Sequence, residues 1–383
     1  MAFLKTLAGT FMLAGMIIGA GMFAIPFAFS QAGFWLGALE LVMLGAVVIV
    51  IHLSYAEVVL ATREVHRLPG YVRIYLGRWG KMISFASIAL SALGTLLVYL
   101  ILGSKFLENA LRVGAWTIVP DSAAYGSLLF VLIIACVGAF VTFFSIRGEV
   151  MINAILTALL ILFIIVLVYA LFPFADLTHI TGFSVERAFL PYGVLLFSLW
   201  GGVVIPDLAT FLGRDQRRMK SAVVTGTVIP ILVYAAFAFA VIGVSGAQTS
   251  REALEGLRGV ITEEMVLLGA LIGLLAVCTS FIALQKTVQA MLELDLGIHR
   301  LVAWVLANTA PVLLYLLGFT DFIVAISIVG AIAIGLDSAL ILSAHYRMRR
   351  ALGISFSFAS MSLRTILFAI VLGGIIYYVS GGI

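Results

Sequence analysis

The stretch GMIIGAGMFAIP, residues 15–26, interrupts the first apolar segment of the chain with three glycines and a proline. Glycine and proline are poor helix formers, so they predict a break inside this segment. Unwound backbone in lipid leaves amide and carbonyl groups unpaired, which is tolerable only where those groups line a cavity or meet a ligand. A second interpretation stays open, in which Gly15 and Gly19 form a small-residue packing face and Pro26 makes a simple kink.

The composition around this stretch is that of a membrane protein. Of 383 residues, 63% are hydrophobic and 10% are charged, against roughly 25% charged in an ordinary soluble protein. So few charges cannot cover a water-soluble particle. The net charge of +4 does not indicate a nucleic-acid partner, because the charges form short clusters between apolar runs. Cys136 and Cys278 fall inside apolar runs, so we expect neither a disulfide framework nor a bound metal.

The charge clusters and turns divide the chain into apolar segments, each about long enough to cross a bilayer. We predict eleven membrane helices in one transmembrane domain, residues 1–383, with no obligatory protein partner evident. The segments are approximately 5–29, 33–62, 82–107, 124–145, 149–172, 190–212, 222–246, 264–290, 301–317, 320–342 and 362–382.

The basic residues predict the orientation in the membrane. If alternate loops are counted together, 17 of the 22 Lys and Arg residues fall on one side. Cytoplasmic loops retain positive charge, so this side is expected to face the cytoplasm. We therefore predict a multi-pass protein of the cell membrane (plasma or inner membrane), with its N-terminus inside and its C-terminus outside.

The sixth segment repeats part of the opening pattern as GGVVIP, residues 201–206. Moving the chain by 180 positions superposes Gly21 on Gly201, Ile25 on Ile205, Pro26 on Pro206 and Gly33 on Gly213. The predicted orientation makes the two copies inverted in the membrane. Inverted interrupted helices indicate a secondary transporter with its substrate site at the midplane. Half-helix N-termini attract an anionic group and unwound carbonyls a cation, so an amino acid zwitterion fits both.

These residues also resemble a known family. Gly15, Gly19, Gly21, Phe23 and Pro26 are similar to the helix 1 signature of the amino acid-polyamine-organocation superfamily. Residues 19–26 and 278–281 resemble the aromatic and hydroxy amino acid permeases and the amino acid/auxin permeases. The resemblance implies an all-α integral membrane protein with a LeuT-like fold. Two inverted five-helix repeats, at about 5–172 and 190–342, would then be followed by one extra helix at about 362–382.

The resemblance also implies a substrate site between the two interrupted helices. Amides of the first break would hold the carboxylate, and carbonyls of both breaks would hold the ammonium. Phe197 and Trp200 are alternative candidates for an aromatic side chain that closes over the substrate, while Tyr99 is either a cavity residue or a packed ring. The residues of this predicted substrate site are Ile17, Gly19, Ala20, Gly21, Tyr99, Phe197, Trp200 and Gly201.

The coupling ion is expected to be Na⁺ or H⁺, with no other cofactor. In sodium-coupled relatives, a hydroxyl pair matching Thr279 and Ser280 joins two helix 1 carbonyls, which correspond to those of Gly15 and Ile18. Hydroxyl and carbonyl oxygens suit a hard cation. Alternatively, the two hydroxyls bond back to their own helix, and Glu40 in the second segment carries a proton.

Charged side chains near the predicted inner ends of the segments are candidates for a gate. Lys286 and Asp337 could pair across the cytoplasmic entrance, where Asp207 also lies. Lys5 resembles a gate residue that pairs with an acid at the end of the eighth segment. The alternative is that Lys286 reaches the lipid headgroups and the acids face water.

We therefore expect a transporter that imports a neutral amino acid, with aromatic ones among the candidates, down a sodium or proton gradient. No phosphate-binding loop indicates ATP-driven pumping, and the five histidines lack the spacing of a metalloenzyme, so we expect no enzyme activity. Two alternatives remain. One is a channel, and the other is a carrier of another small cation or a metal ion on the same scaffold.

Overall fold

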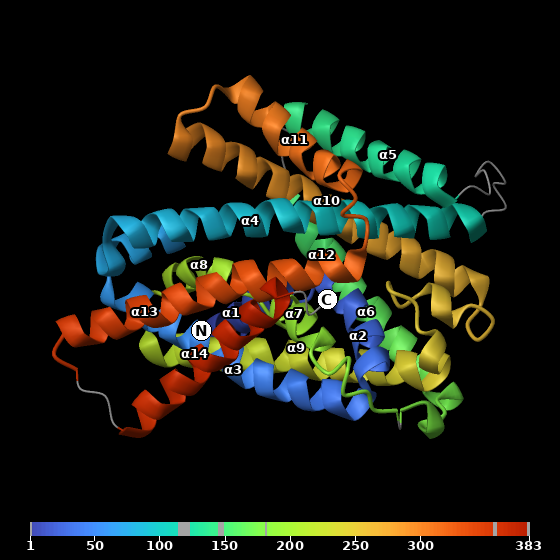
Figure 1. Cartoon of the computed structure of the whole chain (residues 1–383), viewed down its shortest axis with the longest axis horizontal. Coiled ribbons are helices and arrows are strands. Elements are labelled where there is room, and N and C mark those ends of the chain that lie inside the picture. The colour runs from blue at the N-terminus through green and yellow to red at the C-terminus, as the bar shows by residue number, and fades with distance from the viewer. Residues whose placement is uncertain (1, 114–122, 145–148, 181, 355–357, 381–383) are drawn as a thin grey trace.

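The computed structural model describes residues 2–113, 123–144, 149–180, 182–354 and 358–380. Within these ranges every regular element is a helix. The long helices run roughly parallel to the longest axis of the molecule (Figure 1). Seven helices in the described ranges are long and apolar enough to cross a membrane, or eight if the bent pair at the N-terminus counts as one span.

The helices follow one another along the chain, and the connections from α6 to α7 and from α9 to α10 each contain two 3₁₀ turns. Their bounds are α1 (Ala2–Ile17), α2 (Ile25–Ala32), α3 (Phe34–Ala61), α4 (Leu68–Val113), α5 (Ala123–Phe144), α6 (Glu149–Leu171), α7 (Leu190–Ser198), α8 (Ile205–Phe211), α9 (Gln216–Ser245), α10 (Glu263–Leu296), α11 (Arg300–Leu316), α12 (Phe322–Ile328), α13 (Gly335–Ala351) and α14 (Phe358–Val379).

Helix α4 differs from the sequence expectation, which placed the third segment at residues 82–107. It begins at Leu68 and takes in most of the basic stretch before that segment. Gly77, with a φ of 78°, interrupts it. Only glycine adopts this backbone region readily, so the residue separates a short basic helix from the long apolar one.

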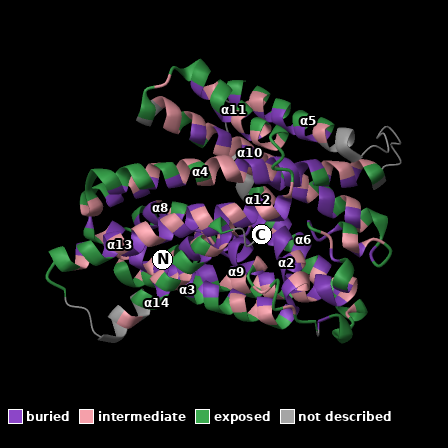
Figure 2. Ribbon diagram, viewed as in Figure 1, coloured by how far each residue is buried: buried purple, intermediate pink, exposed green. Residues whose placement is uncertain are grey.

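Two groups of helices pack around the middle of the molecule. Helix α9 packs along α1 and α3, and α10 packs along α4 and α6. Helices α5 and α11 lie together on the outer side of α4 and α10 (Figure 1). Buried residues concentrate around α7, α9 and α12, whereas the outer faces of α5 and α11 are exposed (Figure 2). Exposed apolar faces of this extent are expected where a protein is surrounded by lipid.

Two helices break in the same way. In the first, α1 ends at Ile17, a 3₁₀ turn spans Ala20–Ala24, and α2 follows at an angle of 50° to α1. In the second, α7 ends at Ser198, a 3₁₀ turn spans Gly202–Val204, and α8 follows. We call these, each with the last residue of the helix before it, the first break (residues 17–24) and the second break (residues 198–204).

The half-helices that follow the two breaks also share their first residues. Pro26 and Pro206 each occupy the first turn of α2 and α8, where the missing proline N–H removes no helical hydrogen bond. Gly33 and Gly213, both with positive φ, follow these half-helices. The four identities found at an offset of 180 residues thus belong to locally similar structures.

A third irregular helix faces the second break. Between α12 and α13, residues Val329–Ile334 form a π-helix, with i→i+5 hydrogen bonds. The segment packs against α7, and Gly330 lies so close to the backbone of Gly193 that a side chain at either position would collide with the other helix. This contact brings the α13 end of the helix to the centre of the protein.

Candidate functional site

The two breaks touch each other at the centre of the molecule. A Cβ atom at Gly21 would lie 2.5 Å from Ser198 Oγ and 3.0 Å from Ser198 Cα. Because part of that clash is with backbone, the contact between the breaks requires glycine at position 21.

One side chain binds both breaks. The buried Tyr234 of α9 donates its hydroxyl hydrogen toward the carbonyl oxygen of Ile17, at 2.7 Å, and that of Ser198, at 3.0 Å. These carbonyls belong to the last residues of α1 and α7, where the helix itself supplies no hydrogen-bond donor. Tyr234 therefore satisfies backbone groups that both breaks set free.

A cavity of about 390 Å³ opens beside the breaks. Its walls come from the first break, α4, α6, the second break, α10 and the π-helix end of α13. Asp337 is the only charged residue among those described that line it. The predicted residues that line the cavity are Gly15, Ile17, Ile18, Gly19, Ala20, Gly21, Tyr99, Phe197, Trp200, Ser280 and Asp337.

On the first break, the backbone faces the open cavity. Gly19 precedes the 3₁₀ turn, and a Cβ atom there would meet nothing within 4 Å. The first N–H groups of a helix have no partner within it. The amides of Gly19, Ala20 and Gly21 therefore form the part of the wall best suited to an anionic group.

On the second break, protein fills the corresponding space. The amide of Gly201 donates to Nε2 of His52 on α3, at 3.2 Å. A Cβ atom at Gly201 would lie 2.6 Å from Leu13 and 2.9 Å from Ile17, so these side chains occupy the space beside Gly201, while Trp200 and Val203 of the same break line the cavity. His52 is fully buried, with its ring 5.4 Å from that of Trp200. Because Nε2 accepts, the neutral ring carries its proton on Nδ1.

The two hydroxyls predicted to bind an ion together, those of Thr279 and Ser280, lie in different surroundings. Ser280 lines the cavity together with Gly15 and Ile18. Thr279 does not line it, and its hydroxyl donates to the carbonyls of Leu275 and Ala276 in its own helix, at 3.0 and 3.1 Å. This is the arrangement given above as the alternative to ion binding, and Thr279 adopts it.

Asp337 is 4% exposed, and its Oδ1 has no hydrogen-bond partner among the described residues. A buried carboxylate needs a cation, a proton or hydrogen bonds to offset its lost hydration. The cavity side of Asp337 is therefore a place where a small cation would be stabilised.

The other predicted gate residues lie outside the cavity. Asp207 forms an exposed ion pair with Arg67, at 2.7 Å. The ammonium of Lys5 lies 5.9 Å from the centre of the Phe211 ring. Lys286 is half-buried on α10. Their roles in gating stay predictions.

Sequence reasoning missed Tyr234 and His52 as parts of this site. Both occur in long apolar runs, where an aromatic or histidine side chain gives no spacing signal. Their partners lie 217 and 149 residues away in the chain. Only the fold brings each of them to a break.

Comparison with known proteins gives the chain its family. The sequence profile of the tryptophan/tyrosine permease family matches residues 4–380. The chain is 23% identical over 247 residues to glutamine transporter 2 of Aliivibrio fischeri, covering 62% of this chain and 61% of that protein. It is 22% identical over 235 residues to tyrosine-specific transport system 1 of Haemophilus influenzae, covering 60% and 56%. The chain thus spans about three fifths of the length of these relatives, which are transporters rather than enzymes.

Solved structures show the same fold. The chain superposes on MhsT in complex with L-phenylalanine with a TM-score of 0.67, at 15% identity and covering 97% of this chain and 98% of that one. It superposes on the inward-facing conformation of Mhp1 with a TM-score of 0.69, at 14% identity and covering 97% and 88%. These likenesses agree with the all-helical LeuT-like fold expected from the sequence.

Proposed function

Because the chain belongs to the tryptophan/tyrosine permease family, we propose that it is a secondary active transporter that imports a neutral amino acid by alternating access. The observation that carries the proposal is the first break, whose amides at Gly19, Ala20 and Gly21 line a central cavity. Amides at a half-helix N-terminus suit the carboxylate that every amino acid has.

The aromatic wall supports the substrate class. Phe23, Tyr99, Phe197 and Trp200 line the cavity, and no basic side chain does among the described residues. The volume of about 390 Å³ lies toward the lower end of the roughly 300–1,000 Å³ typical of small-ligand pockets. A neutral amino acid with an aromatic or medium-sized side chain fits this lining, and the transport relatives named for glutamine and tyrosine are consistent with it.

Charge balance supports cation coupling. A zwitterion brings no net charge into the cavity, whereas Asp337 is a buried acid there. A co-transported Na⁺ or H⁺ would neutralise this acid while the site is closed to water. Ser280 and the carbonyls near Gly15 and Ile18 are candidate sodium ligands, since they line the same cavity.

The membrane arrangement is part of the proposal. It comprises eleven spans, two inverted repeats of five and a cytoplasmic N-terminus. The matching local structures of the two breaks and the LeuT-like neighbours support it.

The test is uptake of labelled neutral amino acids into proteoliposomes under a sodium gradient, a pH gradient or neither. We expect accumulation under one gradient, with lysine, arginine and glutamate competing poorly. No uptake under either gradient would overturn the proposal and favour the channel or metal-ion alternatives.

The neighbouring hydroxyls of Ser280 and Thr279 provide a matched pair of variants that test which residue binds the coupling ion. If sodium drives uptake, Ser280→Ala should raise the sodium concentration for half-maximal uptake by about tenfold, the effect of losing one strong ligand interaction. Thr279→Ala should leave it unchanged, because Thr279 does not line the cavity. Equal effects of the two variants would remove Ser280 from the ion site. If protons drive uptake, Asp337→Asn should abolish accumulation and retain exchange.

A further inference from the structure

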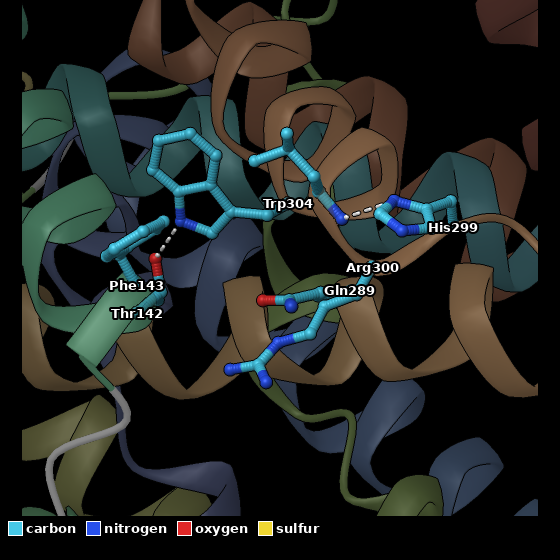
Figure 3. A pocket seen from close by; sticks show the side chains of 7 residues that line it. Thr142, Phe143, Gln289, His299, Arg300 and Trp304 are labelled. Carbon is cyan, nitrogen blue, oxygen red and sulfur yellow. Dashed lines mark hydrogen bonds between the residues drawn. The ribbon is translucent and has the colours of Figure 1, made fainter.

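A second cavity lies apart from the breaks, where the C-terminal end of α5, the last third of α10 and the start of α11 meet. Its volume is about 400 Å³. Figure 3 shows its lining side chains, which combine an apolar wall with basic and amide groups. They are Thr142, Phe143, Gln289, His299, Arg300, Leu301 and Trp304.

The apolar wall faces the surroundings of the protein. Phe143 is 52% exposed and Leu301 is 53% exposed, on helices whose outer faces are largely apolar. Trp304 is held in place, because its indole N–H donates to Thr142 Oγ1 at 3.1 Å and to the carbonyl of Ala139 at 3.2 Å. Tryptophan of this kind is typical of the interface between hydrocarbon and headgroups.

The polar wall offers a positive charge. The exposed Arg300 forms no ion pair with the acids that the structure describes, so its guanidinium is available. Gln289 already donates to Glu293, at 2.7 Å, which leaves its carbonyl oxygen as an acceptor beside the cavity. His299 accepts the Leu301 N–H through Nδ1, at 3.3 Å, so the other ring nitrogen can donate.

We propose that this cavity binds an anionic glycerophospholipid of the surrounding leaflet. Its phosphate would pair with the Arg300 guanidinium, whose planar donors match phosphate oxygens, and a headgroup hydroxyl would donate to Gln289. Its acyl chains would run along Phe143 and Leu301. Arg300 lies between the predicted segments 264–290 and 301–317, in a loop counted on the predicted cytoplasmic side, and basic pockets between membrane helices on that side suit anionic headgroups. A lipid fits better than a soluble anion because the exposed apolar side chains of Phe143 and Leu301 form part of the wall.

The test is lipid binding by the purified full chain, measured by native mass spectrometry with phosphatidylglycerol or phosphatidylcholine. We expect one phosphatidylglycerol to be retained preferentially, and Arg300→Gln to weaken its binding about tenfold, as for loss of a charged hydrogen bond. Arg217→Gln is the matched control, since Arg217 is exposed on the same predicted side and lines neither cavity.

Three results would overturn the proposal. The first is equal retention of phosphatidylglycerol by Arg300→Gln and the parent protein. The second is equal binding of phosphatidylcholine, and the third is displacement of the lipid by millimolar inorganic phosphate, which would make the cavity a soluble-anion site. Thermal unfolding of each variant distinguishes a lost lipid from a lost fold. None of these readouts depends on transport, so failure of the lipid site leaves the proposed function intact.

Discussion

The two breaks have nearly the same local structure and opposite surroundings. At the first break, Gly19 faces empty space and its neighbouring amides line the cavity. At the second, the Gly201 amide is bound by His52, and Leu13 fills the space beside it. The glycines and proline therefore determine that a helix breaks. The neighbouring helices determine whether a ligand or the protein satisfies the freed backbone.

This difference follows from the cost of unpaired backbone in a membrane. An unsatisfied buried amide costs about 1–3 kcal/mol, so a break must find partners. The second break finds them in His52 and Tyr234. The first break finds one in Tyr234 and keeps its amide end for the cavity. Tyr234 thus links the two breaks.

The largest effect on uptake is expected from Gly21→Ala. The added methyl would push Ser198 and the first break apart, which should destabilise the protein by about 1–3 kcal/mol and lower uptake at least tenfold. Gly19→Ala is the control, because its methyl enters open space. It should leave thermal stability unchanged and weaken substrate affinity. If both variants unfold at the same temperature, the packing around Gly21 is no tighter than that around Gly19, and the comparison of the two positions fails.

The next effect concerns the shared hydroxyl. Tyr234→Phe leaves the carbonyls of Ile17 and Ser198 without this donor, so we expect a loss of about 2–4 kcal/mol in the free energy of unfolding. Tyr377→Phe removes a hydroxyl that forms no hydrogen bond among those described, and it should have little effect. Thermal unfolding in detergent measures both. A loss below about 0.5 kcal/mol for Tyr234→Phe would contradict its role at the two breaks.

A smaller effect is expected at the second break alone. His52→Phe leaves the Gly201 amide unpaired and should cost about 1–3 kcal/mol. His52→Gln retains an acceptor oxygen and should recover part of the stability. Substrate affinity, measured by competition in binding assays, should change less than in Gly19→Ala. A larger change in affinity for His52→Phe would show that the second break also binds substrate.

The smallest effect is expected from Asp207→Asn on α8. Its ion pair with Arg67 is largely exposed, with side chains 46% and 67% accessible, so its loss should cost no more than about 1 kcal/mol. The matching position after the first break, Phe27, carries no charge. Amino acid uptake by this variant should be nearly normal. A loss of transport with stability retained would establish Asp207 as a gate residue.

The sequence predicted the broken helices because glycine and proline act locally. The resemblance to a family assigned residues of the first break and Ser280 to one site, and they line one cavity in the structure. The bounds of the spans do not follow from the apolar pattern alone, since α4 joins a basic helix to an apolar one at Gly77.

The remaining site residues could not be predicted from local patterns. Tyr234 and His52 act through hydrogen bonds to backbone groups of other helices, and any buried position of α9 or α3 would look the same in the sequence. Thr279 and Ser280 are adjacent, and only the rotation of α10 separates their surroundings. Such differences are set by packing.

The π-helix at Val329–Ile334 has a consequence for how this protein could have changed during evolution. A π-helix commonly holds one residue more than the α-helix it replaces, so a single deletion there would restore regular winding. Everything beyond it would turn by about 100° relative to α12, the angle of one helical residue. Asp337 would then leave the cavity wall. One codon lost at this position is therefore enough to move the Asp337 carboxyl out of the cavity without changing Asp337 itself.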